Sequence, residues 1–168
     1  MTAPVIRRAG PRDLDDLVTL VREVYEVDHH SFDLDHVVGA LRPLLADDAV
    51  GQVWLVDDPE RPGELGGYAV ITWGWSLESG GRECLLDEMY VRAPGEGLGT
   101  QVLIELIEKA SAAGAAAVFL ETEAHNHRAR VFYGKTGFAL QDSIWMSLRL
   151  QQPDGVGPSG ATTASSDQ

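Results

Sequence analysis

The sequence is poor in cysteine, in basic residues and in long apolar runs, and each shortage excludes something. Cys84 is the single cysteine of 168 residues, so no internal disulfide can form, and we expect a reducing compartment. Lysine and arginine number 13 against 26 aspartates and glutamates, and the formal net charge of -13 argues against nucleic acid or an anionic membrane as a partner. No run of about 18 apolar residues occurs, so we predict neither a signal peptide nor a membrane span and expect a cytoplasmic protein.

What the chain does have is enough apolar residues for one core. Hydrophobic residues make up 44% of a length that suits one domain and is too short for two. Residues 151–168 are rich in Gly, Ser, Thr and Pro, which predicts a disordered C-terminal tail behind a domain at residues 1–150. The acidity of the chain either favours a cationic substrate or serves only solubility.

Apolar periodicity predicts strands and helices in a mixed order. Runs rich in β-branched and aromatic residues predict strands, and apolar residues at helical spacing predict helices. The turn at residues 78–81 makes the strands on either side of it an antiparallel hairpin. The expected strands are 4–8, 53–56, 67–75, 82–91, 115–120, 138–140 and 144–150, and the expected helices are 14–25, 32–45, 98–110 and 127–135.

The most informative stretch is a strand, a glycine-rich turn and a helix that follow one another. The strand Cys84–Val91 is apolar except for the adjacent carboxylates Asp87 and Glu88, which are out of place in a buried strand. The glycines of GEGLG, residues 95–99, then alternate, and glycine lets backbone N–H groups approach a ligand closely. Because a helix start carries partial positive charge, the stretch predicts a seat for a pyrophosphate group.

These residues resemble the GCN5-related N-acetyltransferase (GNAT) superfamily, whose members move an acetyl group from acetyl-CoA to an amine. Met89-Tyr90-Val91 and GEGLG fill the strand and turn motif of that family, and NHRARVFYGKTGF, Asn126 to Phe138, fills a second motif in the right order. The resemblance implies a single α/β domain of the α+β kind, with a central, mixed, mostly antiparallel sheet and helices on both faces. It also implies acetyl-CoA as the acyl donor and no metal.

The resemblance assigns acetyl-CoA to two adjacent places. It implies that the pantetheine arm lies along the backbone of the strand end, with a hydrogen bond from Asn126, and that the pyrophosphate lies over the turn and the helix start. The residues implied are Met89, Tyr90, Val91, Glu96, Gly97, Leu98, Gly99 and Thr100. The Arg or Gln that the family usually places before its G-x-G pair is replaced here by Pro94, and Arg92 is the candidate that would supply the charge instead.

The candidate bases are carboxylates, because an amine must lose its proton before it attacks a thioester. Asp87 ranks first and Glu88 second, and period two sends the two to opposite faces of the strand. Other subgroups of the resembling family use a Glu on the next strand, which corresponds to Glu121, the third candidate. The alternative is that these acids only form ion pairs with neighbouring arginines.

Tyr133 matches the tyrosine with which the resembling family protonates the departing CoA thiolate, although its spacing alone favours a packed aromatic on a helix face. Backbone N–H near Met89 would stabilise the forming oxyanion. We therefore predict an acetyl-CoA-dependent N-acetyltransferase that acts on a primary amine of a small, cationic acceptor or of a basic peptide. A small amino acid stays open as the acceptor, and a homodimer stays open as the assembly.

Other interpretations of the same residues are weaker. A dinucleotide-binding fold would need a third glycine where Val102 stands, and a P-loop would need Gly-Lys-Ser/Thr. His29, His30 and His36 lack the spacing of a structural zinc site, so we predict no metal. A non-catalytic acyl-CoA-binding or sensing domain is the main alternative, because Pro94 alters the turn.

Overall fold

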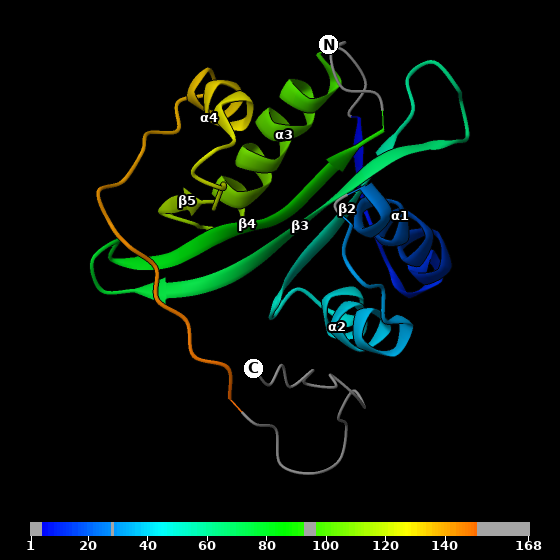
Figure 1. Ribbon diagram of the computed structural model, residues 1–168, viewed down its shortest axis with the longest axis horizontal. Helices are drawn as coiled ribbons and strands as arrows, with labels where there is room; N and C mark the ends of the chain where they lie inside the picture. Colours follow the sequence, from blue (N-terminus) through cyan, green and yellow to red (C-terminus); the bar gives the residue numbers. More distant parts are fainter. Residues whose placement is uncertain (1–4, 28, 93–96, 151–168) are drawn as a thin grey trace, which may run out of the picture. The chain divides into compact units, whose positions relative to one another are not determined.

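The computed structural model describes residues 5–27, 29–92 and 97–150 (Figure 1). Pro94 and Glu96 of the predicted pyrophosphate turn, with Gly95 between them, lie outside the described residues, and so does the predicted tail 151–168. The chain divides into two compact units, Met1–Phe138 and Ala139–Gln168. None of the helices in the described residues is long and apolar enough to cross a membrane.

The first unit is a sheet with helices before, between and after its strands. In chain order the elements are β1 (Ile6–Arg8), the 3-10 turn η1 (Pro11–Asp13), α1 (Leu14–Val27), α2 (Leu34–Ala46), β2 (Gly51–Asp57), β3 (Leu65–Ser76), β4 (Gly81–Val91), α3 (Leu98–Ala112), β5 (Ala117–Phe119) and α4 (His127–Gly134). Each corresponds to an element that the sequence predicts, apart from the short η1, which lies between the predicted strand 4–8 and the predicted helix 14–25.

Within the described residues, the five strands form one sheet in the order β1-β2-β3-β4-β5. β1 to β4 pair antiparallel with their neighbours, and β5 pairs parallel to β4. The predicted hairpin before the glycine turn is confirmed as β3 and β4, which pair from Gly67 opposite Val91 to Ser76 opposite Gly81 with one register shift after Val70. The mixed, mostly antiparallel sheet that the resemblance implies is therefore confirmed.

Helices cover both faces of this sheet, as predicted (Figure 1). α1 and α2 pack on one face in a cluster that includes Leu17 and Leu55, and α3 packs on the other face in a cluster that includes Val56 and Leu103. The adjacent residues Leu55 and Val56 serve opposite clusters because successive side chains of a strand alternate between its faces. None of these four side chains is exposed to solvent, so each contributes about 1.5–3 kcal/mol of burial to the stability of the fold.

The closing strands predicted at 138–140 and 144–150 are wrong in this structure. The described residues of the second unit, 139–150, carry no strand and no helix. A strand requires a neighbour for its backbone N–H and C=O groups, and apolar alternation in the sequence does not supply one. Ile144 and Met146 are 93% and 92% exposed, so burial does not stabilise an extended conformation there.

Candidate active site

A β-bulge in the middle of β4 sets the geometry of the candidate site. Val70 of β3 pairs with Glu88, but the next residue, Ile71, pairs with Leu86, so Asp87 has no partner in β3. The extra residue of a bulge bends its strand and increases the local twist. Period two, on which the predicted facing of the two acids rests, does not hold across Asp87. Asp87 is exposed and Glu88 is half-buried.

The far edge of β4 is open from Leu86 onward, which includes this bulge. β5 pairs with β4 only from Glu83 opposite Ala117 to Leu85 opposite Phe119, whereas β4 continues to Val91. Within the described residues of the first unit, no strand flanks residues 86–91 on that side. The open edge coincides with Met89, Tyr90 and Val91, which the resemblance gives to pantetheine. An extended ligand can hydrogen-bond to such an edge as a further strand would.

Glu88 lies near two tyrosines that the sequence analysis did not single out as site residues. Tyr68 of β3 is completely buried, and its burial, followed by the nearby charge of Glu88, raises the pKa of its hydroxyl. Burial also raises the pKa of Tyr25 on α1, with smaller contributions from Glu88 and then Asp87. Both candidate bases therefore act electrostatically on one tyrosine of α1. Apolar periodicity gave no signal for this, because it does not distinguish a tyrosine hydroxyl beside an acid from one in the core.

Tyr133 is held by aromatic packing on α4. Its ring meets Phe132 at a centroid distance of 5.0 Å and Phe138 at 5.7 Å, both edge to face, and it packs against the cluster on the α3 face of the sheet. The packed aromatic that spacing alone favours is thus present. Burial raises the pKa of the Tyr133 hydroxyl, so the group stays protonated at neutral pH, as a proton donor must.

Asn126 is the N-cap of α4. Its Oδ1 accepts a hydrogen bond from the backbone N–H of Ala129 at 3.0 Å. A cap of this kind stabilises a helix by about 1 kcal/mol. The cap fixes the orientation of the side chain, because the carbonyl oxygen must face the helix start. Its amide nitrogen, a donor, then faces the other way.

The start of α3 is built on Gly97. This residue has φ 86°, in the left-handed region, and it is the N-cap of α3 without a side chain to cap the helix. The backbone N–H of Gln101 donates to the carbonyl of Gly97, which begins the helical ladder, and the N–H groups of Leu98, Gly99 and Thr100 precede it. Free N–H groups and the helix dipole make such a start suited to an anion.

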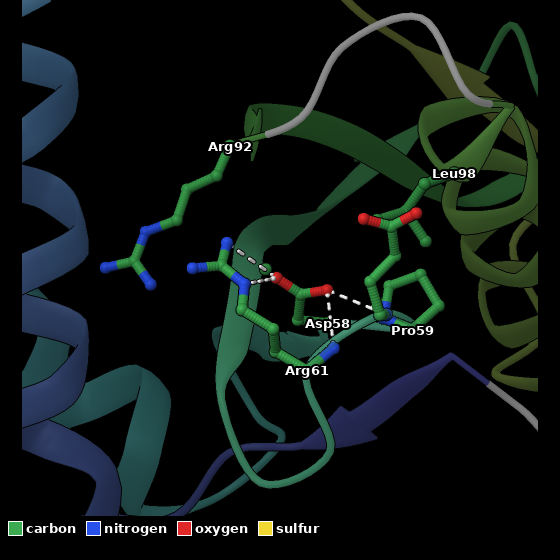
Figure 2. Close-up of a pocket in the computed structure, with 7 residues that line it drawn as sticks. Asp58, Pro59, Arg61, Arg92 and Leu98 are labelled. Atoms are coloured by element: carbon green, nitrogen blue, oxygen red, sulfur yellow. Dashed lines mark hydrogen bonds and ion pairs between the residues drawn. The ribbon is translucent and has the colours of Figure 1, made fainter.

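Arg92, the candidate for the missing charge, is bound elsewhere in the structure. Its Nη2 and Nε lie 2.6 Å and 2.9 Å from the two carboxylate oxygens of Glu23 on α1, and its Nη1 donates to the carbonyl of Leu65. Figure 2 shows Arg92 reaching away from Leu98, across a hollow of about 40 Å³ in which Arg61 is held by Asp58. The guanidinium of Arg92 thus joins β4 to α1.

The third candidate base stands apart from this arrangement. Glu121 follows β5 by two residues, outside any helix or strand, and is exposed. His36 lies in the first turn of α2, where its backbone N–H donates to Asp33, the N-cap of that helix. Within the described residues, no group of three or more His, Cys, Asp or Glu side chains could hold a metal ion.

A bulged, half-open central strand of a mixed sheet leads here into a helix that starts on a glycine, and comparison with known proteins identifies the family that has this fold. The family model described as the acetyltransferase (GNAT) family matches residues 14–138, which include β4, α3 and α4. The chain belongs to the GNAT family and is an N-acetyltransferase. Members of this family use acetyl-CoA.

Solved structures share the fold over most of the chain. An integron cassette protein from the mobile metagenome of Cole Harbour Salt Marsh is 29% identical, with a TM-score of 0.78 over 89% of this chain and 93% of that one. A protein from Arthrobacter sp. FB24 named as a candidate acetyltransferase is 24% identical, with a TM-score of 0.75 over 89% and 98%. A ribosomal-protein-alanine N-acetyltransferase from Brucella melitensis biovar Abortus 2308 is 18% identical, with a TM-score of 0.65 over 86% and 99%. The last two show the fold alone, and no curated protein matches the chain.

Proposed function

We propose that this protein transfers an acetyl group from acetyl-CoA to a primary amine of a small, cationic acceptor by direct attack. The observation that carries the proposal is the bulge at Asp87, which lies at the start of the open β4 edge and contains the adjacent acids Asp87 and Glu88. The pantetheine arm binds along Met89–Val91, and the amide nitrogen of Asn126 donates to it. The pyrophosphate binds at the start of α3, over residues 96–100.

The acceptor amine loses its proton to a carboxylate at the bulge. A free alkyl amine has a pKa of about 10 and is mostly protonated at pH 7, so a base or a water chain that leads to one is required. Asp87 remains the first candidate, because the unpaired bulge residue is exposed where an acceptor would approach. Glu88 follows, between α1 and the sheet, and Glu121 is third because of its place beyond β5.

After the amine attacks, the backbone of β4 and Tyr133 act on the tetrahedral intermediate and on the departing thiolate. Backbone N–H near Met89 stabilises the oxyanion that forms when the amine attacks, since a fixed dipole costs no reorganisation during the reaction. The hydroxyl of Tyr133 donates a proton to the departing thiolate. Burial raises the pKa of this tyrosine, so its hydroxyl is protonated at neutral pH when the thiolate departs.

The net charge of -13 supports a cationic acceptor, such as a polyamine, an aminoglycoside or a basic peptide. The relative from Brucella is named for alanine of a ribosomal protein, but at 18% identity it does not carry that acceptor to this chain. A small-molecule amine or basic peptide is thus the proposed partner, with no nucleic acid or membrane, and a homodimer fits the same scheme. Cys84 is buried and unbridged, which supports the cytoplasm as the compartment.

One observation favours the alternative of a non-catalytic acyl-CoA-binding or sensing domain. Arg92 is bound to Glu23, so it does not replace the side chain that the family usually directs at the pyrophosphate. A domain of that kind would hold acetyl-CoA through the backbone of β4 and α3 and would acetylate no amine.

The test is calorimetric titration with acetyl-CoA, followed by thiol release against a panel of polyamines, aminoglycosides, amino acids and peptides. Binding with turnover of one class of amine supports the proposal and names the acceptor. Asp87→Asn, Glu88→Gln and Glu121→Gln then identify the base, because only the base shifts the acid limb of the pH–rate profile. Binding without turnover of any amine supports the sensing domain, and absence of binding contradicts both interpretations.

A further inference from the structure

The residues that follow the first unit concentrate large apolar side chains in solvent. The side chains concerned are 74–93% exposed and are those of Leu140, Ile144, Trp145, Met146, Leu148 and Leu150. Residues 139–150 form neither strand nor helix, so their backbone has no ladder partner either. Soluble monomers rarely expose so much adjacent apolar surface, and a surface of this kind marks an interface.

The pattern of residues 144–150, here called the apolar segment, suits a strand. In an extended chain alternate side chains share a face, so four of the apolar residues lie together, namely Ile144, Met146, Leu148 and Leu150. Trp145 lies on the other face. The length of the segment is also that of an ordinary strand. The segment therefore has what a strand requires except a neighbour.

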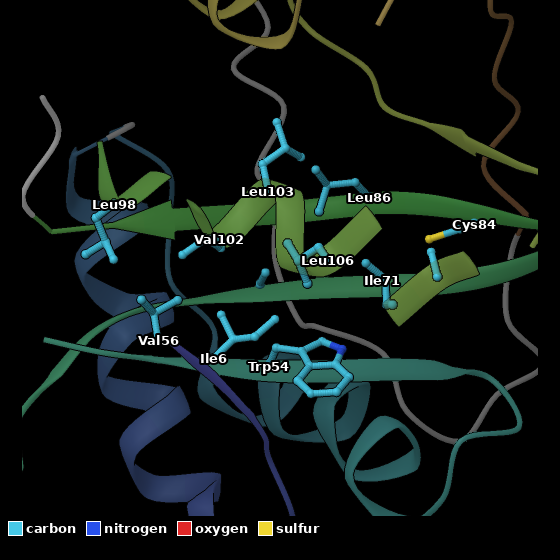
Figure 3. Close-up of a cluster of buried hydrophobic side chains, with 12 residues drawn as sticks. Ile6, Trp54, Val56, Ile71, Cys84, Leu86, Leu98, Val102, Leu103 and Leu106 are labelled. Carbon is cyan, nitrogen blue, oxygen red and sulfur yellow. The ribbon is translucent and has the colours of Figure 1, made fainter. Parts of the chain in front are cut away.

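β5 leaves a matching edge of the sheet free. It pairs with β4 on one side, and among the described residues no strand lies on its other side (Figure 1). Val118 lies opposite Cys84, which stands at one end of the buried cluster in Figure 3, and Val118 itself is only partly buried. Phe119, on the other face, is 37% exposed. The edge thus offers unpaired backbone groups and incompletely covered apolar side chains on both faces.

We propose that two copies of the chain exchange this strand, so that the apolar segment of each copy pairs with the free edge of β5 in the other. The face with four apolar residues covers Val118 and the cluster on the α3 face, and Trp145 covers Phe119 on the opposite face. Each copy supplies one strand and one edge, so two copies satisfy both and the assembly closes with two-fold symmetry. The proposal is independent of which amine is acetylated.

The size and charge of the two surfaces favour a second copy as the occupant. A buried side chain of this size removes roughly 60–120 Å² of apolar surface from water, so the five of the segment remove roughly 300–600 Å². With the surface covered on each receiving edge, two reciprocal contacts reach roughly 1,200–2,400 Å², enough for a stable dimer. Two chains that each carry a net charge of -13 repel one another, and the apolar segment, whose one charge is the positive Arg149, avoids that repulsion.

The first test measures the mass of the full chain in solution. Sedimentation velocity from about 1 μM to about 100 μM should show a species of twice the chain mass of 18.2 kDa. A single monomeric species over this range would overturn the proposal, because the segment would then pair with its own sheet or with nothing. Neither acetyl-CoA nor an acceptor is added, so the result is separate from the test of acetyl transfer.

Charges placed on either surface should weaken the dimer. Met146→Asp together with Leu148→Asp puts two carboxylates on the covering face, and Phe119→Asp puts one on the receiving edge. Each variant should raise the concentration at which half of the chains are dimeric by at least about tenfold, because a buried, unpaired carboxylate is costly. The control is Leu77→Asp, at a 96% exposed leucine in the turn between β3 and β4, which should leave the dimer unchanged. A dimer that withstands the first two changes, or that the control dissociates, contradicts the assignment.

Mixing the two weakened variants tests the exchange itself. When they are unfolded in urea and refolded together, a mixed dimer can form in which the intact segment of the Phe119→Asp copy meets the intact edge of the other copy. Either change alone releases a contact, so combining both in the second contact costs nothing further. The mixture should therefore dimerise at a concentration at least about tenfold lower than either variant alone. Absence of this recovery would overturn the exchange, because only pairing between the segment of one copy and β5 of the other leaves one intact contact in a mixed dimer.

Discussion

The role proposed for Tyr133 can be separated from its packing by one substitution. Tyr133→Phe removes the hydroxyl and keeps the ring that meets Phe132 and Phe138 edge to face. Because no aromatic contact is lost, we expect the free energy of unfolding to change by less than about 1 kcal/mol. General acid catalysis contributes about 100-fold or more, so acetyl transfer should fall by at least that factor. Acetyl-CoA affinity, measured by calorimetry, should stay within about threefold, since the phenol acts only as the thiolate leaves.

The control is Tyr133→Ala, which removes the ring as well. A fully buried aromatic costs about 3–5 kcal/mol when it is truncated, and the half-buried ring of Tyr133 should cost roughly half of that, about 2 kcal/mol, in urea unfolding. The decisive measurement is thiol release by Tyr133→Phe with the acceptor that the panel identifies. Turnover equal to that of the unmodified protein would refute the assignment and leave Tyr133 as a packing residue alone.

Three further predictions concern the fold around the site. Gly97→Ala should destabilise the protein by about 1–2 kcal/mol in urea unfolding, because φ is 86° and an added Cβ meets nothing within 4 Å, whereas Gly39→Ala inside α2 should stabilise it by about 0.5–1 kcal/mol. Leu103→Ala should lower the free energy of unfolding by about 2–5 kcal/mol, because Leu103 is completely buried. Ile104→Ala should lower it by less than about 1 kcal/mol, because Ile104 is 48% exposed, and equal losses in the two variants would contradict the packing of α3. The hydrogen bond from Arg92 is the main reason that the pKa of Glu23 lies below its ordinary value of 4.5. The stability that this pair contributes is therefore fully present above pH 4.5 and is lost as the pH falls through the lowered pKa. Acid unfolding should show a loss below about 1 kcal/mol that Glu23→Gln lacks, and identical acid limbs would exclude the effect.

The order of elements could be predicted from the sequence because each depends on local patterns. The apolar run of β2, the turn between β3 and β4 and the helical spacing of α3 all act over a few residues, and the structure has these elements where the sequence predicts them. The pairing of Glu23 with Arg92 could not be predicted. It joins residues 69 positions apart, and only the packing of α1 beside the end of β4 brings them together.

The predicted closing strand at 144–150 failed for the same physical reason. Its apolar residues alternate like those of a strand, but a strand is defined by its neighbour, which lies elsewhere in the chain. Alternation indicates that a segment can pair and does not indicate that it does. β5, at Ala117–Phe119, is equally short of local support, yet β4 pairs with it and it forms.

The bulge at Asp87 explains why the sequence singled out the two acids of β4 but misjudged the direction in which they face. Strict alternation from Cys84 and Leu86 would carry Glu88 to the α3 face, but in the structure Met89 and Val91 join Cys84 and Leu86 there. The apolar positions on this face therefore advance by two, three and two residues, and the step of three contains the acids. That spacing is present in the sequence, but Leu85, which is apolar and lies on the other face, makes it hard to recognise. The same extra residue turns Glu88 toward α1 and follows the end of the β4–β5 pairing at Leu85 by two residues, so the two acids lie at the start of the open edge of β4.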